Sequence, residues 1–228
     1  MQKWNEINLY SNTRGINRFR GLVETFKALN ADGLKLPEIS NLENWVENSE
    51  ELSNPALKKE IEKKEDNEDL KLALEWSQQL NIEISRLKKD ISKVFSGVKA
   101  SLEKMKKKAD LAVVSSANTE ALMDEWQSYG LDNYVKIILG QESGSKSENI
   151  KKLKAKGYAE DKILMIGDAL GDFRAAEENK VLFYPILAGQ EEKSWQLLYE
   201  EASDKFFSGT YRGKYESELI AEFKSVLN

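Results

Sequence analysis

The chain has 228 residues, 32% of them charged, and a formal net charge of −5 with both signs interspersed, so it lacks the basic surface that nucleic acid binding requires. It contains no cysteine and no histidine, which excludes disulfides, thiolate metal sites, Ser-His-Asp triads and histidine bases. Any catalysis must therefore use carboxylates, lysine, hydroxyl groups, backbone amides and a bound hard metal ion.

The first part of the chain is predicted to be helical. Residues 1–12 show no clear periodicity and lack the apolar core of a signal peptide. No run in the chain approaches the roughly 20 apolar residues that span a bilayer, so we expect a cytoplasmic protein without a membrane partner. Helices are predicted near residues 19–29, 42–46, 55–64 and 67–93. The buried stripe of the last helix is expected to contain Leu70, Leu74, Leu80, Ile84, Leu87 and Ile91.

Arginines are concentrated just before the first of these helices. Arg14 and Arg18 lie within the stretch TRGINRF, and Arg20 follows it. A guanidinium group presents a planar fork of donors that suits phosphate or carboxylate. The alternative interpretation is a solvated helix start.

The sequence pattern changes at Val94. A helix is predicted over residues 99–107, and the apolar run at 111–114 is typical of a strand. Ser115, Ser116 and Asn118 follow that strand and precede a helix predicted over 119–129. Hydroxyl groups between a strand and a helix N-terminus are well placed to bind an anion. The same residues are also ordinary helix caps.

A second strand is predicted over residues 135–139, followed by a glycine-containing loop and Lys146 at the start of the next helix. Lys146 alone would be interpreted as a solvated side chain. Its position after a strand suggests a role in ligand binding, because the carboxyl ends of parallel strands meet at one edge of a sheet, where ligands bind. We therefore expect Lys146 to share that edge with Ser115.

The stretch KILMIGDALGDFRAAEENKVLFY predicts a strand at 163–166, an acidic loop, a helix and a further strand at 181–186. Asp168 and Asp172 are thus expected at the same sheet edge, where two carboxylates suit a hard cation such as Mg²⁺. Alternatively, Asp168 caps the helix and Asp172 is solvated on its first turn. Helices predicted over 193–207 and 214–227 complete the chain.

Three of these segments together resemble motifs two, three and four of the haloacid dehalogenase-like (HAD) phosphohydrolase superfamily: LAVVSSAN, GSKSENIKKL and ILMIGDALGDFRAA. The resemblance covers Val94 to about Ile186. It implies an α/β fold with a three-layer parallel-sheet core over residues 95–228. The helical residues 1–94 would be the all-α cap region that precedes motif two.

The resemblance also implies phosphoryl transfer from a small phosphorylated molecule, with Mg²⁺ as cofactor. Ser115 would donate a hydrogen bond to a phosphoryl oxygen, with Ser116 and Asn118 also in contact with substrate. Lys146 would neutralise phosphate charge and stabilise the nucleophile. Asp168 would ligate Mg²⁺, and Asp172 would ligate it directly or through water. Arg14 and Arg18 would lie near the substrate anion.

Motif one of the family is an apolar strand that ends in D-x-D and supplies the nucleophile. The first aspartate of this sequence is Asp32, beyond the first predicted amphipathic helix. We therefore expect the chain to lack that central strand, either as a shortened phosphatase or as a pseudoenzyme, and to be marginally stable because strand edges are left unpaired. A non-catalytic phosphate-binding, Mg²⁺-binding or protein-interaction module remains the alternative function, and the oligomeric state is left open.

Overall fold

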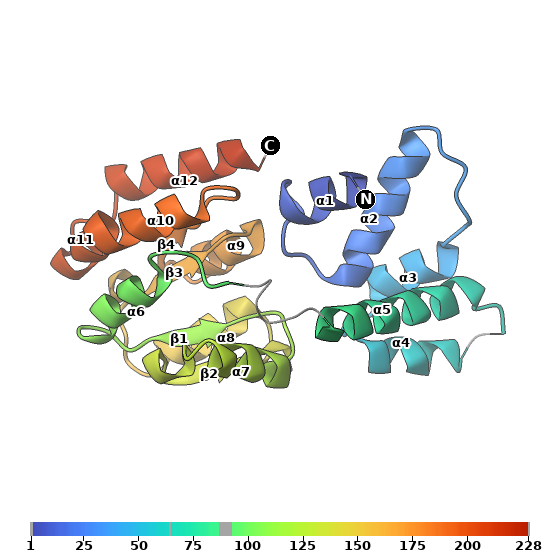
Figure 1. The fold of residues 1–228 in the computed structure, drawn as a ribbon, viewed down its shortest axis with the longest axis horizontal. Coiled ribbons are helices and arrows are strands. Elements are labelled where there is room, and N and C mark those ends of the chain that lie inside the picture. The colour runs from blue at the N-terminus through green and yellow to red at the C-terminus, as the bar shows by residue number, and fades with distance from the viewer. Residues whose placement is uncertain (1, 64, 87–92, 228) are drawn as a thin grey trace. The chain divides into compact units, whose positions relative to one another are not determined.

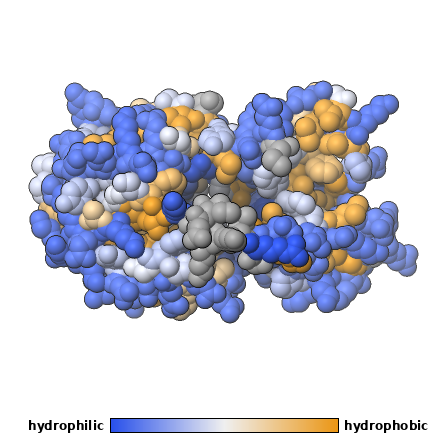
Figure 2. All heavy atoms as spheres, in the orientation of Figure 1, coloured by the Kyte–Doolittle hydropathy of each residue, from blue (hydrophilic) through white to orange (hydrophobic). Residues whose placement is uncertain are grey.

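A computed structural model of the chain describes residues 2–63, 65–86 and 93–227. The chain divides into two compact units, Met1–Lys93 and Val94–Asn228 (Figure 1). Figure 2 shows hydrophilic residues spread over the drawn face, with groups of hydrophobic residues between them. In the described ranges, no helix has the length and apolar character needed to cross a membrane.

The first unit is helical, as predicted. Its elements are α1 (Gln2–Leu9), α2 (Arg18–Ala31), α3 (Ser40–Asn48), α4 (Asn54–Ile61) and α5 (Glu68–Arg86). Helix α1 was not predicted, because its eight residues carry no buried apolar stripe. Residues 87–92 of the predicted helix at 67–93, with Leu87 and Ile91, lie outside the described residues.

The core of this unit packs helices α2 to α5 around aromatic side chains. Phe19 contacts Trp45 edge-to-face, with ring centroids 5.1 Å apart. Leu70 and Ala73 of α5 are buried in the same cluster. The prediction that Ile84 belongs to the buried stripe of α5 is wrong, because 52% of its surface is exposed. The core-facing side of α5 instead continues through a polar residue, Ser77, which hydrophobicity alone does not identify.

The second unit alternates short strands with helices. Its elements are α6 (Val98–Lys106), β1 (Ala112–Val114), α7 (Thr119–Ser128), β2 (Ile137–Leu139), α8 (Lys146–Lys154), β3 (Leu164–Gly167), α9 (Leu170–Glu178), β4 (Leu182–Pro185), α10 (Glu191–Leu197), α11 (Ser203–Ser208) and α12 (Lys214–Val226). Strands β1, β2 and β4 lie within the apolar runs that predicted them, and β3 extends one residue beyond its run, to Gly167. A π-helical turn at Leu198–Ala202 joins α10 to α11.

The strands of this unit form two parallel pairs. Ala112 of β1 is in register with Ile137 of β2, and Leu164 of β3 is in register with Leu182 of β4. In the part of the chain that the structure describes, no ladder of hydrogen bonds joins one pair to the other, so each sheet has two strands. The fold is thus mixed α/β, mostly helical, with small parallel sheets.

Strand β4 is the centre of the second unit's core. Successive side chains of a strand point to opposite faces of its sheet. Leu182 and Tyr184 therefore enter one apolar cluster, together with Leu198 and Tyr211, whereas Phe183 enters another, together with Phe223. All four residues of β4 are buried.

Candidate functional site

The loop between β3 and α9 is organised by Asp172, whose side chain is 5% exposed. Its Oδ2 atom accepts hydrogen bonds from the backbone N–H groups of Asp168 and Ala169, each at 3.1 Å. Both donors lie just before α9, and Asp172 lies in the first turn of that helix, where the helix dipole favours a carboxylate. A methyl group on Gly167 would lie 2.5 Å from Asp172 Cγ and 2.6 Å from Oδ2, so only glycine allows this close approach.

Lys146 completes the environment of that carboxylate. Its Nζ atom forms an ion pair with Asp172 Oδ1, and the lysine side chain is 19% exposed. Lys146 is the first residue of α8, where Ser145 and Glu148 form a reciprocal capping box that fixes the helix start. The segments predicted as motifs three and four are therefore in direct contact. The interpretation of Asp172 as a solvated residue is wrong.

Asp168 lies one residue beyond the end of β3 and is partly buried. Its backbone N–H binds Asp172, so the positions of the two acidic residues are coupled. This arrangement puts Asp168 at the carboxyl end of a parallel strand, as the sequence pattern predicts.

The residues after β1 are held mainly by local contacts. Ser115 donates its backbone N–H to Leu139 O of β2 at 2.9 Å, and its Oγ accepts from the Ala117 N–H at 3.2 Å. Asn118 is the N-cap of α7, with its Oδ1 accepting from the Ala121 N–H at 3.2 Å. Ser116 is exposed.

The structure therefore joins only part of the predicted set. Within the described residues, Ser115 makes no hydrogen bond or ion pair with Lys146 or Asp172. A role for Ser115, Ser116 and Asn118 in phosphate binding stays a prediction.

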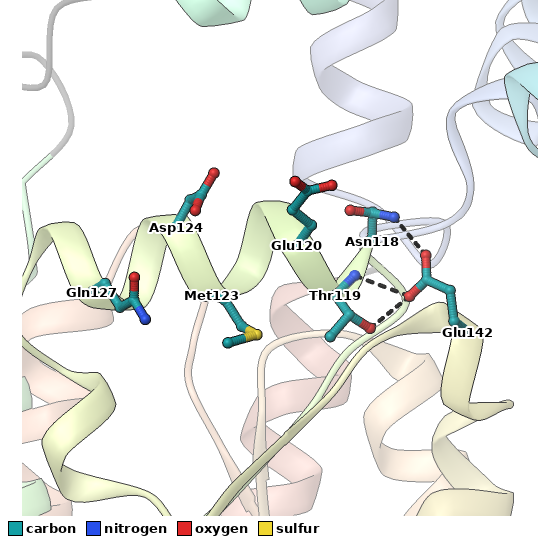
Figure 3. Close-up of a pocket in the computed structure, with 7 residues that line it drawn as sticks. All are labelled: Asn118, Thr119, Glu120, Met123, Asp124, Gln127 and Glu142. Carbon is teal, nitrogen blue, oxygen red and sulfur yellow. Dashed lines mark hydrogen bonds between the residues drawn. The ribbon is translucent and has the colours of Figure 1, made fainter.

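Glu142 holds the start of α7 in place and acts as a polar anchor there, a role that the sequence analysis did not predict. It lies in the loop after β2 and accepts from the Thr119 N–H at 3.0 Å and from the Thr119 hydroxyl at 2.6 Å (Figure 3). Asn118 Nδ2 donates to its other oxygen at 2.5 Å. A carboxylate that caps a helix can be recognised in a sequence only when it lies within a few residues of the helix start. Glu142 is 23 residues from Thr119, the first residue of α7.

This anchor fixes the loops that follow β1 and β2 against each other. A methyl group on Gly140 would lie 2.7 Å from both the Ala117 carbonyl oxygen and the Thr119 nitrogen, so the two loops touch backbone to backbone. Together with Glu142 they border a surface depression along α7, lined by Asn118, Thr119, Glu120, Met123, Asp124, Gln127 and Glu142 (Figure 3).

We expect Glu142 to make stability depend on pH in the acid range. The hydrogen bond from the Thr119 hydroxyl, followed by those from backbone N–H groups, lowers the pKa of Glu142 to about 2, against an ordinary value of 4.5. A depressed pKa contributes stability that is fully present above the ordinary value and is lost as the pH falls toward the folded-state value. Glu142→Gln should therefore lower the melting temperature at pH 7, and the deficit should shrink as the pH falls from about 4.5 to 2.

Melting temperatures measured across this pH range check the prediction. Glu120→Gln is the matched control for net charge, because it also removes one negative charge near the N-terminus of α7, in the first turn of that helix. If Glu142→Gln lowered the melting temperature by the same amount from pH 7 to pH 2, the low pKa of Glu142 would not contribute to stability.

The predicted anion-binding arginines belong to the helical unit. Arg18 Nη1 donates to Asn81 Oδ1 at 2.6 Å and to Ser77 Oγ at 3.2 Å, and burial lowers the pKa of its guanidinium. Arg14 Nη1 donates to Leu9 O at 2.6 Å. Arg18 therefore links α2 to α5 inside this unit. A contact of either arginine with substrate stays a prediction.

No cluster of three or more acidic side chains able to hold a metal ion occurs among the described residues. The chemistry of the donor set nevertheless fits Mg²⁺, which commonly binds proteins through one or two carboxylates and keeps several waters. Asp168 and Asp172 supply two such carboxylates on one loop. Lys146 occupies Oδ1 of Asp172. Asp172 therefore fits contact with Mg²⁺ through a water molecule better than direct ligation.

The fold and the site define an α/β protein that presents a lysine and two aspartates at the carboxyl ends of parallel strands. The family model described as haloacid dehalogenase-like hydrolase matches residues 16–185, and the chain belongs to this family. The superfamily resemblance is thus confirmed. No curated protein and no solved structure matches the chain.

Proposed function

We propose that the chain carries the phosphate site of a Mg²⁺-dependent phosphohydrolase that acts on a small phosphorylated molecule. The observation that supports this most is the ion pair between Lys146 and Asp172 beside the backbone amides of the β3–α9 loop. The two N–H groups hold the carboxylate of Asp172, and that carboxylate holds the lysine cation. A lysine held in this way suits a phosphoryl group, whose transfer depends on positioning and charge neutralisation.

Each residue has a distinct role in this proposal. Lys146 neutralises charge on the phosphoryl oxygens, and Asp172 holds the lysine in place. Ser115, with Ser116 and Asn118 nearby, donates hydrogen bonds to the phosphoryl group. Asp168, with Asp172 through water, would hold Mg²⁺, which supplies further charge neutralisation when bound.

The helical unit acts as a cap over a three-layer core in this proposal, with Arg14 and Arg18 directed to the anionic part of the substrate. Arginine suits that task because its guanidinium group can make two parallel bonds to one anion. Both guanidinium groups also donate within the helical unit, Arg18 to Ser77 and Asn81, and Arg14 to the Leu9 carbonyl.

Binding of inorganic phosphate in the presence of Mg²⁺ tests the site directly. In calorimetric titrations, Lys146→Met should weaken phosphate binding by about tenfold, because a charge-assisted hydrogen bond is lost. Lys151→Met is the matched control, since Lys151 is an exposed lysine on the same helix. Equal phosphate affinity in the two variants, with both folded by circular dichroism, would refute the proposed role of Lys146.

Turnover of an aryl phosphate with Mg²⁺ tests the expectation about motif one. We expect the 228-residue chain to hydrolyse this substrate at the rate of buffer alone, because the sequence has no aspartate before Asp32 to form the phosphorylated intermediate. Robust turnover that Asp168→Asn abolishes would show that the chain contains a working nucleophile.

A further inference from the structure

Asn179 is a buried asparagine that joins the two helices carrying Lys146 and Asp172. It follows α9 directly, as the C-cap of that helix. Its Nδ2 atom donates to the carbonyl oxygen and to the hydroxyl oxygen of Ser147, both at 3.0 Å. The same atom donates to the Ala175 carbonyl at 2.9 Å. Asn179 therefore binds, across the helix pair, the residue that follows Lys146 in α8.

The bond to Ala175 shows which way the Asn179 side chain points. Ala175 lies four residues before Asn179, so the side chain folds back by about one turn toward the N-terminus of α9. Asp172 lies about one further turn back on the same side, because residues seven positions apart share one side of a helix. The contact with Ser147 and the ion pair of Lys146 with Asp172 are therefore about one turn apart along α9.

This spacing holds Lys146 at both ends. Its backbone is fixed at the start of α8, next to Ser147, and its ammonium group is held by Asp172. A lysine carries its ammonium group on a flexible four-carbon stem, so fixing only one end leaves the other end free to move. Fixing both ends restricts the ammonium group to one place.

A second buried asparagine holds the chain on the other side of Lys146. Asn149 is fully buried, and its Nδ2 atom donates to the Gly144 carbonyl at 3.1 Å. Gly144 lies in the loop that precedes α8, directly before the N-cap residue Ser145. Two buried side-chain amides thus hold the backbone on both sides of Lys146, at Gly144 and at Ser147.

Packing of α8 on α9 does not depend on the Asn179 amide alone. Ile150 of α8 and Ala176 of α9 belong to one apolar cluster. Lys154, in the last turn of α8, donates to the main-chain carbonyl of Asn179 at 2.7 Å and pairs with Glu160 at 2.8 Å. An apolar side chain in place of the amide would suit packing alone, because burial of a polar group costs free energy.

We propose that Asn179 is a positioning residue for Lys146. Its side-chain amide, together with that of Asn149, sets the place where the lysine ammonium group meets a phosphoryl oxygen. Neither asparagine contacts the phosphoryl group, and each acts through the backbone that carries Lys146. This role rests on the proposed function, because it concerns the binding of phosphate by Lys146.

A double-substitution cycle tests whether Asn179 acts through Lys146, with calorimetric titrations of inorganic phosphate in the presence of Mg²⁺. Asn179→Leu keeps the approximate size of the side chain and removes the amide. It should weaken phosphate binding about fivefold, less than the loss expected for Lys146→Met. In the Lys146→Met background, Asn179→Leu should change the affinity by less than about twofold, because its effect needs the lysine.

Lys154→Met is the matched control for the contact between the two helices. It removes a polar link between α8 and the end of α9 and leaves the Asn179 side chain in place. Phosphate affinity should stay within about twofold of the unsubstituted chain. A loss as large as that for Asn179→Leu would overturn the proposal. Losses for Asn179→Leu and Lys146→Met that add in free energy would overturn it too.

Nuclear magnetic resonance of the lysine ammonium groups, without phosphate, gives a readout that does not depend on the proposed function. The order parameter of the Lys146 ammonium group should exceed that of Lys151, an exposed lysine of the same helix. Asn179→Leu should lower the value for Lys146. If that variant does not fold, Asn149→Leu replaces it, since it also removes a buried Oδ1 atom that has no hydrogen-bond partner among the described residues.

The two measurements separate failure of this role from failure of the proposed function. If Lys146→Met weakens phosphate binding and Asn179→Leu does not, the positioning role is wrong and the proposed function stands. If Lys146→Met leaves the affinity unchanged, the proposed function is wrong. The order parameter then tests Asn179 by itself, and an unchanged value for Lys146 would refute the positioning role.

Discussion

Replacing Gly167 with alanine should lower the free energy of unfolding of the second unit by about 3 kcal/mol, which is typical of severe overpacking. The new methyl group would lie 2.5 Å from Asp172 Cγ, and Asp172 is fixed by its position on the first turn of α9. Relief of this contact requires α9 to move away from β3. That movement would separate Asp172 from the N–H groups of Asp168 and Ala169 and from Lys146.

The matched control for this substitution is four residues away. Gly171 lies inside α9, and a methyl group there has no atom within 4 Å. Gly171→Ala should therefore be neutral or stabilise by up to about 1 kcal/mol, through helix propensity. Native-state hydrogen exchange of the β3 and α9 amides measures both effects in the unit concerned. Equal stability of the two alanine variants would show that the β3–α9 loop adapts freely.

Replacing Tyr211 with alanine should lower the free energy of unfolding by about 4 kcal/mol, as expected for deletion of a buried aromatic side chain. Tyr211 has no exposed surface, and its ring contacts Tyr215 edge-to-face at 5.4 Å. Its hydroxyl donates to the Phe183 carbonyl of β4 at 2.7 Å. Burial raises the pKa of Tyr211, which keeps this hydroxyl protonated as a donor.

One further variant separates the hydrogen bond of Tyr211 from the packing of its ring, and a second is a control at an exposed tyrosine. Tyr211→Phe keeps the ring and removes only the hydrogen bond, so it should lose about 1–2 kcal/mol. Tyr199→Ala removes a tyrosine that is exposed and should lose less than about 1 kcal/mol. Hydrogen exchange of the β4 amides again gives the measurement. A loss for Tyr211→Phe as large as that for Tyr211→Ala would show that the hydrogen bond, rather than packing, holds β4.

Local sequence patterns predicted the elements of the second unit well. Apolar runs gave all four strands, and Gly167-Asp168 marked the end of β3. Strand pairing was not predictable in the same way, because a run such as LAVV does not specify its neighbours. The separation of β1–β2 from β3–β4 therefore had to come from the structure.

The candidate site was predicted to a similar extent. Lys146 and Asp172 were expected at one sheet edge because parallel strands end there, and their ion pair agrees with that expectation. The burial of Asp172 and the anchoring role of Glu142 could not be read from the sequence. Both depend on contacts between residues more than 20 positions apart, namely Lys146 with Asp172 and Thr119 with Glu142.

The position of β4 between two apolar clusters limits how this chain can change during evolution. A single inserted or deleted residue within Leu182–Pro185 would reverse which side chains meet which cluster, so Phe183 and Tyr184 would each face the wrong partners. Changes of chain length in homologous sequences should consequently fall in the loops that flank β4, while the strand itself varies by substitution alone.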